Sequence, residues 1–218
     1  MNELRDLVLV GGAGTSSDVL ALIASINSKE PRYRVLGLLD DALSPGTEKF
    51  GVQVLGNLAC ASDFSSVGFI DCLGSPRSYH LRESILEKNG LAELEFETLV
   101  HSSVMMAEDA SIDKGSILFP NVVVLSNVTV GRHVTILSGT VLNHDVVVGD
   151  WSILGSGVML SGTVTVGNTC YLGTASSVRE GVTVGDGSLV GMGAAVTKDV
   201  DSGVVVAGVP ARVLRPAK

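Results

Sequence analysis

The sequence predicts two domains, a small α/β domain with a parallel sheet followed by a parallel β-helix. Two patterns lead to this fold class. A strand, a glycine turn and a helix follow one another near the N-terminus, and an aliphatic residue stands at every sixth position over the second half of the chain. A fixed period of six, repeated many times, is typical of a solenoid. We therefore expect domains at residues 1–100 and 101–218.

The first hundred residues alternate between apolar runs and segments with helical spacing. Apolar runs predict strands, and apolar residues spaced three and four apart predict helices. Strands are expected at 7–10, 33–39 and 69–73, and helices at 18–27 and 78–88. This alternation indicates a Rossmann-like parallel sheet, in which ligands bind beyond the carboxyl ends of the strands.

Three turns at those strand ends form a candidate substrate site. Its residues are Gly11, Gly12, Ala13 and Gly14, then Asp40 and Asp41, and finally Arg77. A phosphate of a nucleotide or nucleotide sugar can rest on the N-terminus of the first helix, and the two aspartates can accept hydrogen bonds from a ribose or a base edge. The glycine turn lacks a complete G-x-G-x-x-G, because Ser17 replaces the third glycine, which disfavours a nicotinamide dinucleotide. A tight turn without a ligand and a solvated Asp-Asp turn remain alternatives.

The second half carries sixteen aliphatic residues in phase, from Met106 to Val196. The position two places before each one holds only Ala, Ser, Thr, Cys or Val. Three hexads make one coil, and stacked coils bury one another's aliphatic side chains. Glycine often follows the aliphatic residue, and we expect it there in tight turns with positive φ. A β-sandwich would break the phase, so we expect no inserted loop between Val104 and Thr197.

Composition excludes several classes of protein. The net charge of −8 argues against nonspecific nucleic-acid binding. The chain is 45% hydrophobic, but no apolar run of about 18 residues predicts a membrane span. The N-terminus lacks the basic segment of a signal peptide. The three cysteines form no CxxC pair, which indicates reduced thiols and a cytoplasmic protein.

His144 is the candidate catalytic base among the four histidines. It stands two places after the inward Leu142, so its ring should point out of the wall, and Asp145 can orient it. Gly162 lies one coil, or three hexads, further on, where its N–H can stabilise the oxyanion formed from a thioester. No cysteine or serine forms a convincing nucleophile pair with His144, which favours direct transfer. We interpret the others, His80, His101 and His133, as structural or solvated.

Several segments resemble the left-handed β-helix acyltransferases. They are the hexad ladder, Asn143-His144-Asp145 and the closing Val206-Ala207-Gly208-Val209-Pro210-Ala211-Arg212. With the first glycine turn, Leu38-Leu39-Asp40-Asp41 and Gly51-Val52-Gln53-Val54-Leu55-Gly56, the chain is similar along essentially its whole length to bacterial sugar acetyltransferases with an N-terminal nucleotide-binding domain. That group includes N-acetyltransferases for nucleotide-linked amino sugars and sialic acid O-acetyltransferases.

The resemblance implies a homotrimer that acetylates a nucleotide-linked amino sugar for a surface glycan. Acetyl-CoA would lie in the grooves between neighbouring helices as a co-substrate, with no permanently bound cofactor. The resemblance also implies that His144 is the general base, that Asp145 orients it, and that the Gly162 amide meets the thioester oxygen. For acetyl-CoA we expect contacts from Gly162, Gly173, Val209, Pro210 and Arg212.

The chain departs from the resemblance at two positions, and three other functions stay open. Thr15 and Ile153 stand where such relatives often carry histidines, which puts the identity of the sugar in doubt. Alternatives are O-acetylation of a sugar such as sialic acid, a non-catalytic sugar-binding solenoid, and a metal-dependent enzyme on the same fold. The last needs three convergent histidines, whereas the solenoid offers only His133 and His144, so we expect no metal site.

Overall fold

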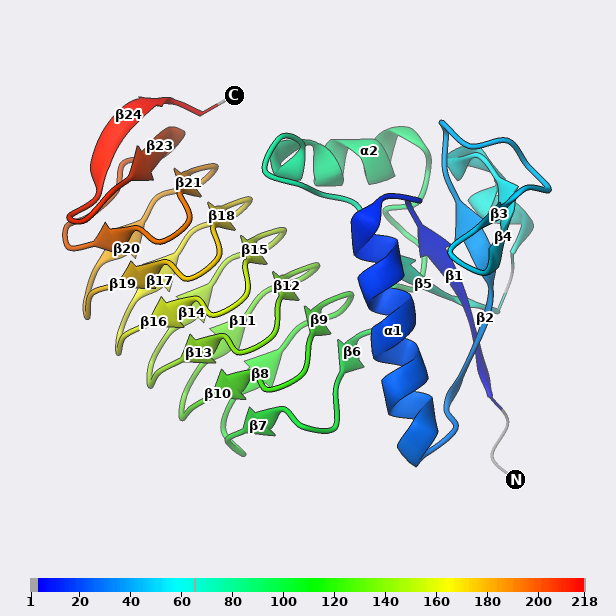
Figure 1. Ribbon diagram of the computed structural model, residues 1–218, viewed down its shortest axis with the longest axis horizontal. Coiled ribbons are helices and arrows are strands. Elements are labelled where there is room, and N and C mark those ends of the chain that lie inside the picture. The colour runs from blue at the N-terminus through cyan, green and yellow to red at the C-terminus, as the bar shows by residue number, and fades with distance from the viewer. Residues whose placement is uncertain (1–3, 65, 218) are drawn as a thin grey trace. The chain divides into compact units, whose positions relative to one another are not determined.

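The computed structural model describes residues 4–64 and 66–217 of the chain. The chain forms two compact units (Figure 1). The first comprises Met1–Gly74 and Leu81–Thr98, and the second comprises Ser75–His80 and Leu99–Lys218. The segment Ser75–His80 therefore leaves the first unit, packs with the second, and returns before the solenoid begins.

The first unit is built on a five-stranded sheet in the order β3-β4-β2-β1-β5. Its strands are β1 (Arg5–Val10), β2 (Tyr33–Leu39), β3 (Glu48–Lys49), β4 (Val52–Gly56) and β5 (Gly68–Asp71). Its helices are α1 (Gly14–Lys29), α2 (Arg82–Lys88) and the 3-10 turn η1 (Leu58–Asp63); a second 3-10 turn, η2 (Tyr79–Leu81), precedes α2. The pairs β1–β2, β1–β5 and β2–β4 are parallel, which confirms the predicted parallel sheet.

Two features of this unit differ from the prediction. A hairpin adds the antiparallel strand β3 next to β4, so the sheet is mixed. Its turn places Phe50 at φ 54° and Gly51 at φ 80°, which is the left-handed pair that a two-residue hairpin requires. The helix α1 begins at Gly14 rather than at residue 18, because periodicity detects only the buried side of a helix, which here starts with Ser16 and Val19.

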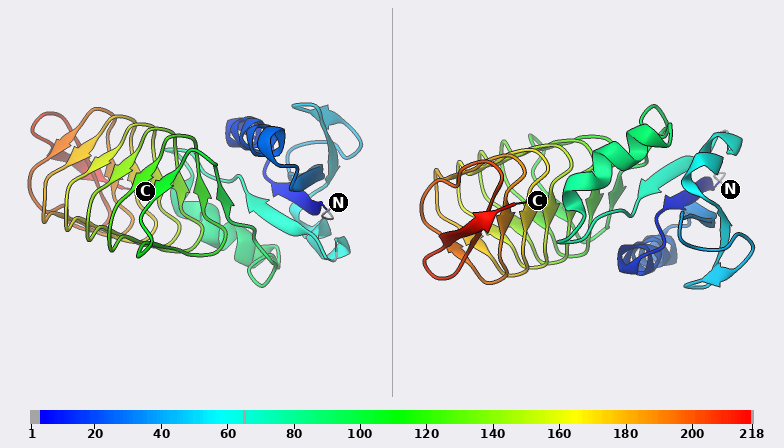
Figure 2. Two further views of the ribbon diagram at one scale, coloured as in Figure 1. Left: turned by 90° about the horizontal axis from the view of Figure 1, so that it is seen from below. Right: turned by 90° about the horizontal axis from the view of Figure 1, so that it is seen from above.

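The second unit is a left-handed parallel β-helix with three sheets, whose stacked coils are seen from two sides in Figure 2. Face 1 contains β7 (Met105–Met106), β10 (Val123–Val124), β13 (Val141–Leu142), β16 (Met159–Leu160), β19 (Ser177–Val178) and β22 (Ala195–Val196). Face 2 contains β8 (Ser111–Ile112), β11 (Thr129–Val130), β14 (Val147–Val148), β17 (Thr165–Val166) and β20 (Thr183–Val184). Face 3 contains β6 (Leu99–Val100), β9 (Ile117–Leu118), β12 (Thr135–Ile136), β15 (Ile153–Leu154), β18 (Tyr171–Leu172), β21 (Leu189–Val190), β23 (Val204–Ala207) and β24 (Arg212–Pro216).

The coil length and the aliphatic ladder agree with the sequence prediction. Val123 pairs with Val141, and Val141 pairs with Met159, so neighbouring strands are three hexads apart and no loop is inserted. The ladder residues fill the core, where Leu142 and Leu154 are fully buried. The first two ladder residues are exceptions, since Ile112 is only partly buried and Met106 is 46% exposed. Met106 lies in β7, the edge strand of face 1, where no earlier coil covers it.

The glycines after the ladder residues serve a different purpose from the predicted one. They do not have positive φ; that conformation occurs three places after the ladder residue, as in Asn127, Asp145 and Trp151. The next coil instead approaches too closely for a side chain. A Cβ on Gly149 would lie 2.7 Å from the backbone nitrogen of Asn168. These glycines therefore allow coil stacking rather than turn formation.

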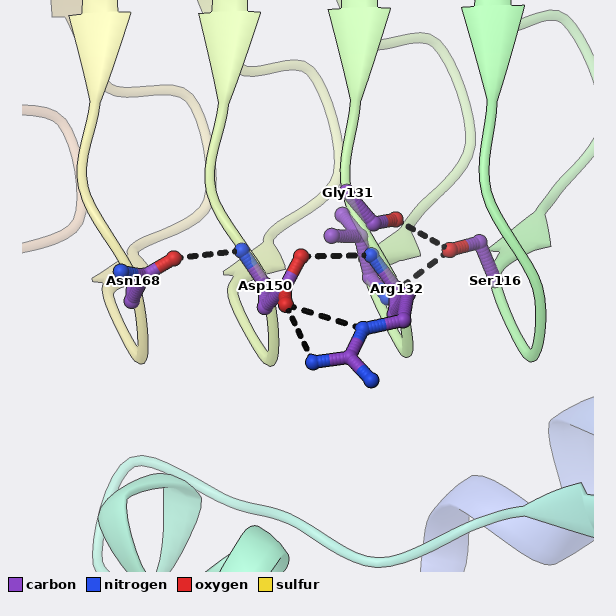
Figure 3. Close-up of polar contacts among 6 residues, drawn as sticks. Ser116, Gly131, Arg132, Asp150 and Asn168 are labelled. Atoms are coloured by element: carbon purple, nitrogen blue, oxygen red, sulfur yellow. Dashed lines mark hydrogen bonds and ion pairs between the residues drawn. The ribbon is translucent and has the colours of Figure 1, made fainter.

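A row of polar side chains, one from each coil, lies next to these glycines (Figure 3). The Asp150 Oδ1 accepts the N–H of Arg132 at 2.8 Å, and the Asn168 Oδ1 accepts the N–H of Asp150 at 2.9 Å. One coil further, the Asp186 Oδ1 accepts the N–H of Asn168 at 2.7 Å. On the coil before this row, the Ser116 hydroxyl donates to the Gly131 carbonyl. The three aspartate and asparagine rungs each accept a backbone N–H that has no acceptor in the parallel sheet.

Replacing Asp186 by alanine should destabilise the solenoid by about 0.5–1.5 kcal/mol, because the N–H of Asn168 loses its acceptor. Asp186→Asn is the matched control, since an amide oxygen preserves the acceptor. Urea unfolding of both variants measures the difference. Equal loss of stability in the two variants would show that the rung is not what Asp186 contributes.

Candidate active site

The turn between β13 and β14 presents His144 and Asp145 at the surface of the solenoid. Their side chains are 58% and 46% exposed, and the His144 Nδ1 lies 2.8 Å from the Asp145 Oδ2. Asp145 has φ 60°, a left-handed conformation that aspartate tolerates better than most residues. The turn is fixed to its neighbours because the N–H of Asp145 donates to the Ser126 carbonyl and the His144 carbonyl accepts from Thr163.

The carboxylate of Asp145 is held from the preceding coil. The Asn127 Nδ2 donates to the Asp145 Oδ1 at 2.6 Å. Hydrogen bonds from Asn127 and from His144 keep the pKa of Asp145 below its usual value. An ionised carboxylate only accepts, so the His144 Nδ1 carries the proton in this bond. In a neutral imidazole this leaves the lone pair on Nε2.

Gly162 lies directly against this ring on the next coil. A Cβ at that position would collide with the Cε1 and Nε2 atoms of His144, so the imidazole occupies the space that any other residue would fill. Within residues 4–64 and 66–217, the N–H of Gly162 donates to no acceptor. A proton acceptor and an unused amide donor thus stand side by side.

The glycine turn and the aspartate turn meet within the first unit. The N–H of Gly12 donates to the Asp40 Oδ2 at 2.7 Å, and the N–H of Ala42 donates to the Asp40 Oδ1 at 2.8 Å. The Asp41 Oδ1 accepts the N–H of Leu58 at 2.9 Å, at the start of η1. Asp40 therefore joins the two turns with both of its oxygens, whereas Asp41 bonds to the start of η1 through Oδ1.

The N-terminus of α1 has the features of an anion site. Its N-cap is Ala13, which provides no side-chain cap, and its first turn contains no acidic residue. Gly11 has φ 101°, which a glycine accommodates, and a Cβ on Gly14 would meet no atom within 4 Å. The first N–H groups of this 16-residue helix are thus accessible, as phosphate binding requires.

Arg77 belongs to the second unit. It lines a cavity of about 220 Å³ together with Tyr79, His80 and Arg215. The segment is fixed there because the Tyr79 hydroxyl donates to the Gly187 carbonyl at 2.9 Å. The structure therefore places Arg77 beside a second arginine of the C-terminal strand.

The residues expected to contact acetyl-CoA lie in the last coils. Gly173 allows the next coil to stack closely, since a Cβ there would lie 2.5 Å from the backbone nitrogen of Met192. Val209 is 77% exposed and precedes Pro210 through a cis peptide bond. Arg212 begins β24 and lines a cavity of about 260 Å³ that Lys198 also lines.

The remaining residues of interest have structural surroundings. His133 stacks on Trp151 with ring centroids 4.0 Å apart, and the His101 Nδ1 lies 2.7 Å from the Ser103 hydroxyl. Ile153 is 6% exposed in β15, and Thr15 lies in the first turn of α1. Sequence reasoning missed Asn127, although its place three hexads before Asp145 could have identified it.

The described part of the chain holds neither a metal cluster nor a membrane span. No group of three or more His, Cys, Asp or Glu side chains is placed to hold a metal ion in residues 4–64 and 66–217. In the same ranges, no helix has the length and apolar character needed to cross a membrane.

Comparisons with known proteins agree with this architecture. Residues 127–162 match the family model described as bacterial transferase hexapeptide (six repeats). A perosamine N-acetyltransferase variant from Caulobacter crescentus, solved with CoA and GDP-perosamine and carrying asparagine in place of one histidine, is 25% identical with a TM-score of 0.82, over 97% of this chain and 98% of that one. The acetyltransferase domain of PglB from Neisseria gonorrhoeae is 26% identical with a TM-score of 0.83, over 96% of this chain and 100% of that one.

WeeI from Acinetobacter baumannii gives values close to these, with 26% identity and a TM-score of 0.81 over 96% of this chain and 100% of that one. A search of the curated proteins finds no match. The chain therefore carries the hexapeptide repeat and shares its fold with these acetyltransferase structures over nearly their whole length.

Proposed function

We propose that the chain is an acetyl-CoA-dependent N-acetyltransferase that acts on the amino group of a nucleotide-linked deoxyamino sugar. The observation that carries this proposal is the arrangement at His144, whose Nδ1 bonds to Asp145 while its ring lies against Gly162. The similarity to acetyltransferases solved with CoA and GDP-perosamine, or with acetyl coenzyme A, supports the two substrate classes.

The chemistry follows from the two groups at this site. A neutral amine attacks the thioester carbonyl while the His144 Nε2 accepts its proton, and Asp145 stabilises the imidazolium that forms. The N–H of Gly162 donates to the oxyanion of the tetrahedral intermediate. When the C–S bond breaks, the thiolate of CoA receives the proton from His144, and the acetyl group remains on the sugar nitrogen as an amide.

The two units suit the two substrates. The N-terminus of α1 offers the N–H groups of Gly14 and Thr15 for the diphosphate of the nucleotide sugar, whereas the N–H groups of Gly11 and Gly12 already donate within the first unit. The solenoid exposes large apolar side chains on its outer faces, among them Met105 (53%), Met159 (45%) and Val147 (42%). We propose that further copies of the chain cover them in a homotrimer, with acetyl-CoA in the grooves between protomers and Val209, Pro210 and Arg212 near the donor.

The test is release of CoA thiol from acetyl-CoA in the presence of a panel of acceptors. Nucleotide-linked amino sugars should give release, and the matching nucleotide sugars with a hydroxyl in place of the amine should not. Free sialic acid belongs in the panel as the O-acetylation arm. Release with sialic acid alone would replace the N-acetyltransferase by an O-acetyltransferase, and no release with any acceptor would refute the proposal.

Gly162→Ala should displace the His144 ring, because the added Cβ would clash with its Cε1 and Nε2 atoms. We expect kcat to fall by about 10²-fold, the usual effect of disturbing one catalytic hydrogen-bonding group. A double-mutant cycle with His144→Ala gives the control, since without the ring the new methyl group has nothing to displace. The clash should also lower the free energy of unfolding in Gly162→Ala, and this loss should be smaller when His144 is already alanine. An equal loss in both backgrounds would place the clash elsewhere.

A further inference from the structure

Four residues of the active-site region come from three consecutive coils. Asn127 and Asp145 are one solenoid period apart, and so are His144 and Gly162, so each pair occupies equivalent positions on neighbouring coils. The solenoid period therefore stacks an amide below the carboxylate and a glycine above the imidazole. Both hydrogen bonds converge on the carboxylate of Asp145, from the Asn127 Nδ2 at 2.6 Å and from the His144 Nδ1 at 2.8 Å.

The two oxygens of Asp145 have separate tasks in this chain of bonds. The Oδ1 accepts from Asn127, and the Oδ2 faces the His144 Nδ1. A surface carboxylate with one partner can rotate about its terminal torsion, which is broad. The second partner removes that freedom, so the Oδ2 stays in line with the imidazole. Since Asp145 is 46% exposed, packing alone does not provide this restraint.

The structure assigns Asn127 as a positioning residue of the active site, which holds the Asp145 carboxylate so that the His144 Nε2 faces Gly162. This inference rests on the proposed acetyltransfer. Asn127 does not touch the reacting atoms; it acts through Asp145. The array is an Asn–Asp–His relay whose members come from two coils.

The backbone of the turn does not explain Asn127. Its φ of 57° recurs at the equivalent turn position in Thr163 and Ala175, so no amide side chain is needed to form this turn. Asn121 is the informative comparison, because it has the same residue type, the same turn position and φ 62°. Within residues 4–64 and 66–217, the side-chain amide of Asn121 makes no hydrogen bond, whereas that of Asn127 reaches Asp145.

The experiment compares Asn127→Gly with Asn121→Gly. Glycine adopts positive φ without strain, so both variants keep the turn and lose only the side chain. We expect Asn127→Gly to lower kcat about tenfold, as loss of an orienting partner commonly does, with KM for acetyl-CoA unchanged. Asn121→Gly should stay close to wild type. Similar melting temperatures of the two variants exclude a difference in folding.

Two further readouts separate positioning from structure. The ¹⁵N chemical shifts of the His144 ring should show one tautomer, protonated on Nδ1, in the wild type and a mixture in Asn127→Gly. The pKa of Asp145 should rise in Asn127→Gly, because Asn127 is the main cause of its depression and His144 is the titratable group that faces it. In Asn127→Asp, kcat should fall as it does in Asn127→Gly, since a second carboxylate cannot donate a hydrogen bond to the first.

The outcomes are distinct from those for the proposed function. If the wild type acetylates no acceptor, the proposed function fails, whereas the tautomer measurement still tests the relay. If the wild type is active and the two glycine variants have the same kcat and the same ring tautomer, the assignment of Asn127 is overturned.

Discussion

Replacing His144 by alanine should lower kcat for acetyl transfer by about 10²–10⁴-fold, the range that a positioned general base contributes. The fold should be unaffected, because the side chain is 58% exposed and takes no part in the buried ladder. Steady-state kinetics of thiol release measure the effect, and thermal unfolding verifies that the solenoid is intact.

The reason for so large an effect is that, among the described residues bonded to His144, no other group is a strong proton acceptor. Asp145 is the other ionisable member of the hydrogen-bonded array, and its depressed pKa makes it a weak base. As the pH falls, Asp145 remains ionised until its own lowered pKa is reached, so its carboxylate keeps accepting the bond from the His144 Nδ1 in mildly acidic solution.

Ser126→Ala provides a matched control, since Ser126 occupies the position equivalent to His144 one coil earlier and is also exposed. It should keep kcat near that of the wild type. A His144→Ala variant with kcat within about twofold of wild type would remove this residue from the mechanism, and with it the acyltransfer chemistry drawn above.

The solenoid could be predicted from the sequence because its period is set by geometry. Every coil must return to the same face after three sides, so a residue such as Leu142 and its counterpart three hexads later share one environment. The same arithmetic places Gly162 beside His144. Positive φ occurs at nearby glycines such as Gly139 and Gly157, but not at the glycines directly after the ladder residues, because close approach between coils requires those for a reason that a single coil does not show.

The sequence could not separate structural from functional residues at equivalent positions. His144 stands two places after its ladder residue, and so do Asp150 and Asn168 on another corner. The latter two accept backbone N–H groups across coils, whereas His144 bonds to a side chain and leaves Nε2 open. Only the contacts show this distinction. In the first unit, the bond from Gly12 to Asp40 was likewise hidden, because it depends on the register of β1 and β2.

Arg82→Ala should destabilise the first unit by about 3–5 kcal/mol. Asp71 ends β5 and Arg82 begins α2, and their side chains are both 0% exposed with Nη2 and Oδ2 2.9 Å apart. Removal of the arginine leaves a buried carboxylate without its counter-ion. Arg34→Ala is the matched control, because its pair with Asp6 is 63% exposed on the arginine side, and an exposed ion pair contributes little to stability.

The two units allow this loss to be located. Trp151 is the single tryptophan of the chain and lies in the solenoid, so its fluorescence reports unfolding of the second unit. Hydrogen exchange of the β1 amides reports the first. In Arg82→Ala, the β1 amides should exchange faster while the Trp151 transition stays at the same urea concentration. The double variant Asp71→Leu, Arg82→Leu should recover part of the stability, because it leaves no buried charge. If Arg82→Ala and Arg34→Ala exchange alike, the buried pair does not hold β5 to α2.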